Sequence, residues 1–180
     1  MGPRSHRPQA REPEVNQRES KFLQNTVLAA QQTQRSYGVP ASITIAQAIL
    51  ESGWGESALA VKANNYFGIK AALTSEPYVE FPTTEFISGR QAHVLGRFAR
   101  YASPIDCFKA HGALLATSKR YIGAMAVAAD PEAFAAQLQV CGYSTSPDYA
   151  SRLIDLMRIY DLTQYDIFGP IDGPAKEAAA

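Results

Sequence analysis

Residues 46–57 read Ala-Gln-Ala-Ile-Leu-Glu-Ser-Gly-Trp-Gly-Glu-Ser. The apolar residues before Glu51 cover a wide face at helical spacing, which predicts a buried helix over 42–52, and Gly53 is a stop signal. The negative pole of the helix dipole and burial beside Trp54 both disfavour a charged carboxylate, so we expect a raised pKa for Glu51. A carboxylic acid that is protonated near neutral pH can donate to a glycosidic oxygen. The alternative is a solvated glutamate at a frayed helix end.

A further helix is predicted over 17–36, before this stretch. Phe22, Leu23 and Val27 lie at helical spacing, Gly38 suits a C-terminal cap, and Pro40 blocks continuation.

The middle of the chain is rich in β-branched and aromatic residues. Residues 78–87 and 92–101 predict two strands, with a hairpin turn over 88–91. Pro82 indicates that the first strand lies at an edge or is broken there.

Helices resume after the hairpin. Ser103, Asp130 and Ser146 each precede a proline, which predicts three N-caps, and Gly142 ends the helix that starts near Pro131. The predicted fold class is therefore α+β and mainly α. It consists of a helical body with a small inserted β-hairpin lobe and a ligand cleft between them.

Length and composition favour one domain. The chain has 180 residues, of which 46% are hydrophobic. We expect residues 1–20, which carry three prolines among charges, to form a tail or docking arm; 21–165 to form the domain; and 166–180 to form a second tail.

The charge balance argues against nucleic acid or an anionic membrane as partner, since 17 basic residues match 17 acidic ones. No apolar run reaches transmembrane length, and the N-terminal residues lack the apolar core of a secretory signal.

Cysteine and histidine usage predicts no cofactor and no metal. Cys107 and Cys141 lie among apolar neighbours, so we expect both to be free and buried. The histidines are scattered at positions 6, 93 and 111 and form no metal-spaced group.

Several segments together resemble glycoside hydrolase family 73, the glucosaminidases of flagellar hydrolases and bacterial autolysins. The matching segments follow the family's order: residues 47–57, 64–70, 84–86 with Gly89, 97–101 and 142–150. The resemblance implies a lysozyme-like fold and an endo-β-N-acetylglucosaminidase that cleaves peptidoglycan between N-acetylglucosamine and N-acetylmuramic acid. It makes Glu51 the general acid, Glu85 the second acidic residue, and Tyr143 a cleft residue that orients the acetamido group or stabilises the transition state.

The second carboxylate decides the mechanism. A Glu85 across the cleft would activate water for inversion, whereas a distant or mobile one would leave the substrate's own 2-acetamido group as the nucleophile. We favour acetamido assistance, and we interpret Glu80 as a rim charge.

Five further residues are candidates for substrate binding. We expect Asn65 to point toward the ligand and Phe67 to brace its loop; Asn64 has either a binding role or a turn role. Trp54 and Tyr121 are each either cleft wall or core.

One segment departs from the family pattern. The family commonly reads Tyr-Ala-Thr-Asp-Pro where this chain reads Tyr-Ser-Thr-Ser-Pro over 143–147. Ser146 can cap a helix but supplies no charge, so any role of the family's aspartate in the cleft is in doubt.

Two alternatives stay open beside the leading hypothesis. One is a muramidase or lytic transglycosylase that keeps Glu51 as its acid. The other is a wall-binding or virion assembly component with weak catalysis. The expected partners are peptidoglycan glycan strands, with possible docking to a larger assembly through the N-terminal tail. The expected place of action is the cell wall, periplasmic or extracellular, reached by a flagellar, phage or virion route or with a leader outside this sequence.

Overall fold

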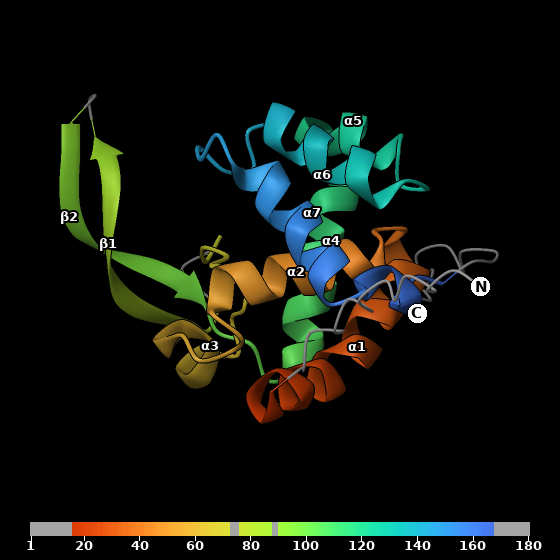
Figure 1. Cartoon of the computed structure of the whole chain (residues 1–180). Coiled ribbons are helices and arrows are strands. Elements are labelled where there is room, and N and C mark those ends of the chain that lie inside the picture. Colours follow the sequence, from red (N-terminus) through yellow and green to blue (C-terminus); the bar gives the residue numbers. More distant parts are fainter. Residues whose placement is uncertain (1–15, 73–75, 88–89, 168–180) are drawn as a thin grey trace, which may run out of the picture.

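The structure, a computed structural model, describes residues 16–72, 76–87 and 90–167. It is mainly helical with a small β-hairpin, as predicted (Figure 1). The elements in chain order are α1 (Gln17–Tyr37), α2 (Ala41–Ser52), α3 (Ala58–Ala63), β1 (Tyr78–Ile87), β2 (Arg90–Ala99), α4 (Pro104–Thr117), η1 (Lys119–Tyr121), α5 (Ile122–Met125), α6 (Pro131–Val140), α7 (Tyr149–Ile159) and η2 (Leu162–Tyr165).

Helix α2 is the centre of the helical body. It packs against α1, α6, α7 and η2, and its side chains from 41 to 49 are all buried. This burial on every side explains why its sequence is apolar over such a wide face. Gly53 ends the helix in the left-handed conformation at φ 57°, as its position predicted.

Helices α1 and α4 cross at very close range at Gly112. A Cβ atom at this position would lie 2.3 Å from Cγ2 of Thr33 and 2.9 Å from Cδ2 of Tyr37. Only glycine lets the two backbones approach this closely, so Gly112 fixes how α4 lies on α1.

The predicted caps hold for two of the three later helices. Ser103 accepts from the backbone N–H of Asp106, and Asp130 accepts from two N–H groups at the start of α6. The predicted Ser146 cap is wrong, because α7 begins only at Tyr149 with Asp148 as its N-cap. Ser146 instead donates its hydroxyl to the Asp148 carboxylate. The short helix α3 was not predicted.

The hairpin pairs β1 with β2 in antiparallel register, from Tyr78 opposite Ala99 to Ile87 opposite Arg90. Figure 1 shows it projecting away from the helical body. Residues 88 and 89, in the predicted turn, lie outside the described residues. Strand β1 continues through Pro82, which is tolerated because both strands of this sheet, in the part of the chain that the structure describes, are edge strands.

The helical body extends slightly beyond the predicted domain limits. Residues 17–20 form the first turn of α1, capped by Asn16, and so do not belong to the predicted arm. Asp166 accepts hydrogen bonds from the backbone and hydroxyl of Ser42 at 2.8 and 2.7 Å, which ties residue 166 to α2. Residues 1–15 and 168–180 of the predicted tails lie outside the described residues.

Cys107 and Cys141 are both free, as predicted, although Cys141 is only partly buried. Burial raises the pKa of the Cys107 thiol to about 12, which argues against thiolate chemistry at neutral pH. Within the described ranges, no group of three or more side chains is placed to hold a metal ion. None of the helices described is both long and apolar enough to cross a membrane.

Candidate active site

Glu51 lies at the end of α2 and opens onto a cleft of about 550 Å³. The cleft wall combines aromatic rings, two basic side chains and one carboxylate. Its lining residues are Glu51, Phe67, Gly68, Ile69, Lys70, Leu114, Arg120, Tyr121, Tyr143 and Ser144. Of the residues that the structure describes, Glu51 is therefore the single acid in the cleft.

The surroundings of Glu51 favour its protonated form. Desolvation raises its pKa above the ordinary value of 4.5, while a hydrogen bond from Tyr149 and the charge of Arg152 act in the opposite direction. The residue is nonetheless exposed, and it lines the cleft. Glu51 thus combines access to a ligand with a raised pKa, which is the combination that a general acid needs.

Two buried polar residues, Gln47 and Tyr149, form a hydrogen-bonded pair next to Glu51. The amide of Gln47, one helical turn before Glu51, donates to the Tyr149 hydroxyl at 2.9 Å. Since that oxygen already accepts from Gln47, its own hydrogen is available for the Glu51 carboxylate. Gln47 and Tyr149 were not predicted as site residues. The sequence did offer a signal for Gln47, because it is a polar residue on the otherwise apolar face of α2. No pattern in the neighbouring sequence indicated Tyr149.

We expect Tyr149→Phe to move the alkaline limb of the pH–rate profile to higher pH. The hydrogen bond from Tyr149 stabilises the charged carboxylate. Its loss therefore raises the pKa of Glu51 further, and the acid stays protonated up to a higher pH. The measurement is kcat/KM against pH. The matched control is Tyr160→Phe, since Tyr160 donates to Glu19 at 2.9 Å and does not line the cleft. A limb that stays in place or moves to lower pH would contradict the assignment.

Tyr143 and Tyr121 lie together in the cleft wall. Their ring centroids are 5.9 Å apart, and Tyr143 also stacks on Tyr149 at 5.5 Å. The Arg120 side chain donates to the backbone carbonyls of Cys141 and Gly142, and so holds the turn that leads into Tyr143. The structure therefore brings four sequence-predicted residues, Glu51, Phe67, Tyr121 and Tyr143, into one cavity.

The two asparagines of the 64–70 segment take structural roles, which corrects the expectation for Asn65. Asn65 is 1% exposed, and its amide donates to the carbonyls of Ile69 and Ala99 while its oxygen accepts from the N–H of Ile69. Its hydrogen-bonding groups are occupied by backbone, so it shapes the loop and does not face the ligand. Asn64 ends α3 in the left-handed conformation and donates to the Tyr101 carbonyl at 3.0 Å. Phe67 braces the loop against α4, as expected, and also lines the cleft.

Trp54 lies outside the cleft. It packs edge-on against Phe22 of α1 and Tyr160 after α7, with centroids 5.5 and 4.8 Å away. Its exposed part belongs to a separate hollow beside Arg18 and Glu56. The structure thus places Trp54 at a helix junction and not in contact with the cavity at Glu51.

Glu85 and Glu80 both lie on β1. The Glu85 backbone pairs with Ala92, but its side chain lies outside the described part of the structure. Glu80 is exposed and forms an ion pair with Arg97 of β2 at 3.3 Å, a position that fits a rim charge.

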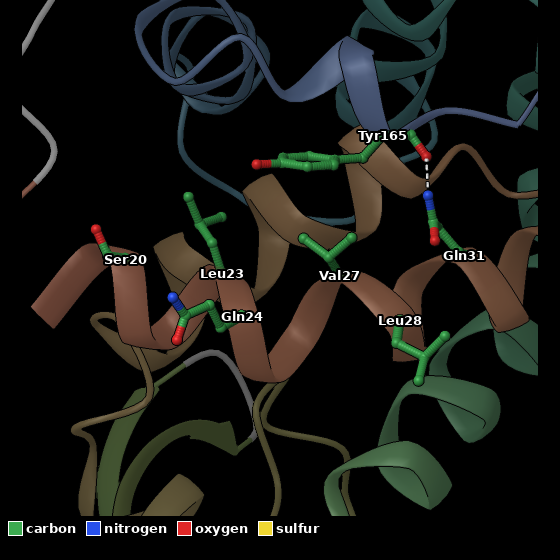
Figure 2. Close-up of a pocket in the computed structure, with 7 residues that line it drawn as sticks. All are labelled: Ser20, Leu23, Gln24, Val27, Leu28, Gln31 and Tyr165. Carbon is green, nitrogen blue, oxygen red and sulfur yellow. Dashed lines mark hydrogen bonds between the residues drawn. The ribbon is translucent and has the colours of Figure 1, made fainter.

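A second hollow of about 520 Å³ lies along α1, next to η2. Figure 2 shows Leu23 and Val27 of α1 beneath the ring of Tyr165, with Gln31 donating to the Tyr165 carbonyl at 3.0 Å. No carboxylate is among the described residues that line it, so it lacks the acid that the cleft at Glu51 provides.

The known proteins that this chain resembles in sequence are glucosaminidases and peptidoglycan hydrolases, a class whose chemistry an acid in a cleft can serve. The model of the glucosaminidase family, described as mannosyl-glycoprotein endo-beta-N-acetylglucosaminidase, matches residues 27–162. The chain is 36% identical to exo-glucosaminidase LytG of Bacillus subtilis, covering 83% of this chain and 54% of that protein. It is also 36% identical to peptidoglycan hydrolase FlgJ of Salmonella typhimurium, over 76% and 45% of the two chains. The chain thus spans about half the length of these curated relatives.

The fold is similar to that of solved family structures. The catalytic domain of the autolysin Auto from Listeria monocytogenes superposes with a TM-score of 0.75 at 30% identity, over 85% of this chain and 90% of that one. The glycoside hydrolase domain of Salmonella typhimurium FlgJ gives a TM-score of 0.66 at 32% identity, over 81% and 89%.

Proposed function

The chain belongs to the glucosaminidase family, glycoside hydrolase family 73, with its lysozyme-like fold, and from this we propose that it is a peptidoglycan hydrolase of the endo-β-N-acetylglucosaminidase type. The proposed substrate is the glycan strand of the cell wall, and the bond cut joins N-acetylglucosamine to N-acetylmuramic acid. The observation that carries the proposal is Glu51, an acid with a raised pKa at the edge of an aromatic cleft.

The charges of the cleft suit this substrate. Lys70 and Arg120 are both among its lining residues, and their positive charge complements the carboxylate of the muramyl lactyl group and those of the stem peptides. Phe67 and Tyr121, which are 6% and 5% exposed, add only the edges of their rings to the apolar wall of the cleft.

The proposed mechanism uses the substrate's 2-acetamido group as the nucleophile. Its carbonyl oxygen attacks C1 while Glu51 donates a proton to the departing glycosidic oxygen, which leaves an oxazolinium ion and the alcohol. Water then adds to C1 and gives its proton to Glu51, so the anomeric configuration is retained. The support is that the substrate itself carries the acetamido group and that Glu51, an acid with a raised pKa, lines the cleft, whereas the hairpin whose β1 strand bears Glu85 projects away from the helical body (Figure 1).

We expect Glu85→Gln to lower kcat by less than about tenfold, because a carboxylate outside the bond-breaking steps contributes little to their barrier. The matched control is Glu80→Gln, from the same strand and paired with Arg97. NMR of the first product formed should show the β-anomer. A loss of about 10³-fold together with the α-anomer would show that Glu85 activates water for inversion.

The bond assignment is tested by end-group analysis. Purified peptidoglycan is digested with wild type or Glu51→Gln, reduced with borohydride and analysed by mass spectrometry. We expect reduced N-acetylglucosamine ends from wild type alone, with oligosaccharides early in the digest if the cut is internal and only the smallest fragments if it is terminal. Reduced or anhydro-muramic ends would indicate a muramidase or lytic transglycosylase. No new ends from either protein would indicate a wall-binding component.

A further inference from the structure

A histidine lies directly behind the cleft tyrosine. His111, on α4, is 0% exposed, and its ring stacks on Phe67 with centroids 3.9 Å apart and an interplanar angle of 13°. Its Nε2 atom is 3.3 Å from the hydroxyl oxygen of Tyr143. His111 is not among the residues that line the cleft, so Tyr143 stands between it and any ligand there.

The imidazole carries a single hydrogen on its nitrogens. Burial lowers the pKa of His111 to about 3, so the ring is neutral at physiological pH and only one nitrogen is an N–H. Nδ1 is buried and has no hydrogen-bond partner among the described residues. The position of that one hydrogen therefore decides which of His111 and Tyr143 is the donor.

The two tautomers differ in what they leave unpaired. A hydrogen on Nδ1 would bury an N–H donor without a partner, whereas a hydrogen on Nε2 leaves only an unpaired lone pair. Buried N–H groups without an acceptor are the rarer defect. With the hydrogen on Nε2, the Tyr143 oxygen accepts from His111, and the Tyr143 hydroxyl hydrogen remains for donation into the cleft.

We infer that His111 is a positioning residue that donates its Nε2–H to Tyr143, so that Tyr143 donates its own hydrogen to the carbonyl oxygen of the substrate's 2-acetamido group. That oxygen has two lone pairs, and a hydrogen bond to one of them aims the other at C1. The inference rests on the proposed function for its substrate, but the tautomer belongs to the protein alone.

The tautomer can be measured without substrate. Long-range ¹H–¹⁵N correlation on histidine-labelled protein distinguishes the two ring nitrogens, and the signals of His111 are identified by their disappearance in His111→Gln. We expect the Nε2–H tautomer at neutral pH. A hydrogen on Nδ1 would overturn the inference while leaving the bond assignment untouched.

A kinetic cycle separates positioning from packing. We expect His111→Leu, which keeps an apolar side chain against Phe67, to lower kcat about tenfold with a small effect on KM. His111→Gln, which again offers an N–H to Tyr143, should recover part of that loss. In a Tyr143→Phe background, His111→Leu should lower kcat only slightly further, because the Tyr143 hydroxyl through which His111 acts is absent. Equal losses in both backgrounds, with the folded fraction verified by circular dichroism, would show that His111 only packs.

Discussion

Glu51→Gln is expected to lower kcat about 10³-fold, within the range of contributions measured for general acids. Glutamine keeps the size of the side chain and cannot give a proton to the glycosidic oxygen, so the loss reports proton donation and not shape. The measurement is the rate of release of reducing ends from purified peptidoglycan. Glu56→Gln is the matched control, because Glu56 is exposed, pairs with Arg18 at 3.3 Å and does not line the cleft. Equal rates for wild type and Glu51→Gln would remove Glu51 from the mechanism.

The same substitution should raise stability at neutral pH. The folded-state pKa of Glu51 lies above its unfolded value, so the folded protein keeps this proton to a higher pH than the unfolded chain does. The free energy of unfolding therefore falls as pH rises from the unfolded pKa to the folded pKa. A neutral glutamine does not incur this loss. We expect the melting temperature of Glu51→Gln to exceed that of wild type at neutral pH, and the difference to vanish below the ordinary carboxylate pKa. A fall in both rate and neutral-pH melting temperature would indicate misfolding instead of a lost acid.

Gly112→Val is expected to destabilise the protein by about 3 kcal/mol, at the upper end of the usual cost of overpacking. The first added atom would already lie 2.3 Å from Thr33, whose side chain is buried, so α1 and α4 must move apart. For a chain of this size that loss corresponds to a fall of about 6–12 °C in melting temperature.

A matched glycine shows whether the effect is local. A Cβ at Gly123 would meet the end of the Gln137 side chain at 3.1 Å, which can rotate away, and the sulfur of Cys141 at an ordinary 4.0 Å. We expect Gly123→Ala to change stability by less than about 0.5 kcal/mol. Wild-type stability of Gly112→Val, measured by urea unfolding, would mean that the two helices do not approach each other this closely and would remove Gly112 as the residue that sets their crossing.

The parts of the fold that were predicted are those with strong local signals. The bounds of α1 and α2 were predicted to within one residue, because Gly38, Pro40 and Gly53 mark their ends. The start of α7 was placed too early, since Ser146 and Asp148 both have the chemistry of a cap and only tertiary packing selects between them. Helix α3 was missed because its six residues are too few to show a periodic pattern.

The site was predicted less completely than the fold. A motif can supply Glu51, Phe67 and Tyr143, but it does not say which way a side chain points, and Asn65 turned inward to the backbone carbonyls of Ile69 and Ala99. Tyr149 and His111 were missed as site residues because each acts through a partner far away in sequence. His111, for example, meets Tyr143 across 32 residues. Such contacts leave no trace in local spacing.

The hydrogen bond from Gln47 to Tyr149 joins residues 102 positions apart, and this separation has a consequence for biosynthesis. A ribosome that has synthesised the chain only as far as α6 has already made Glu51 but not the Tyr149 ring that donates to it. The helix that carries the acid is then also without α7, one of the elements that bury it. Long-range contacts of this kind form late. The nascent chain, and any fragment cut before Tyr149, therefore carries the acid without the surroundings that tune it, so we expect the proposed proton donation only once α7 has been made and packed onto α2.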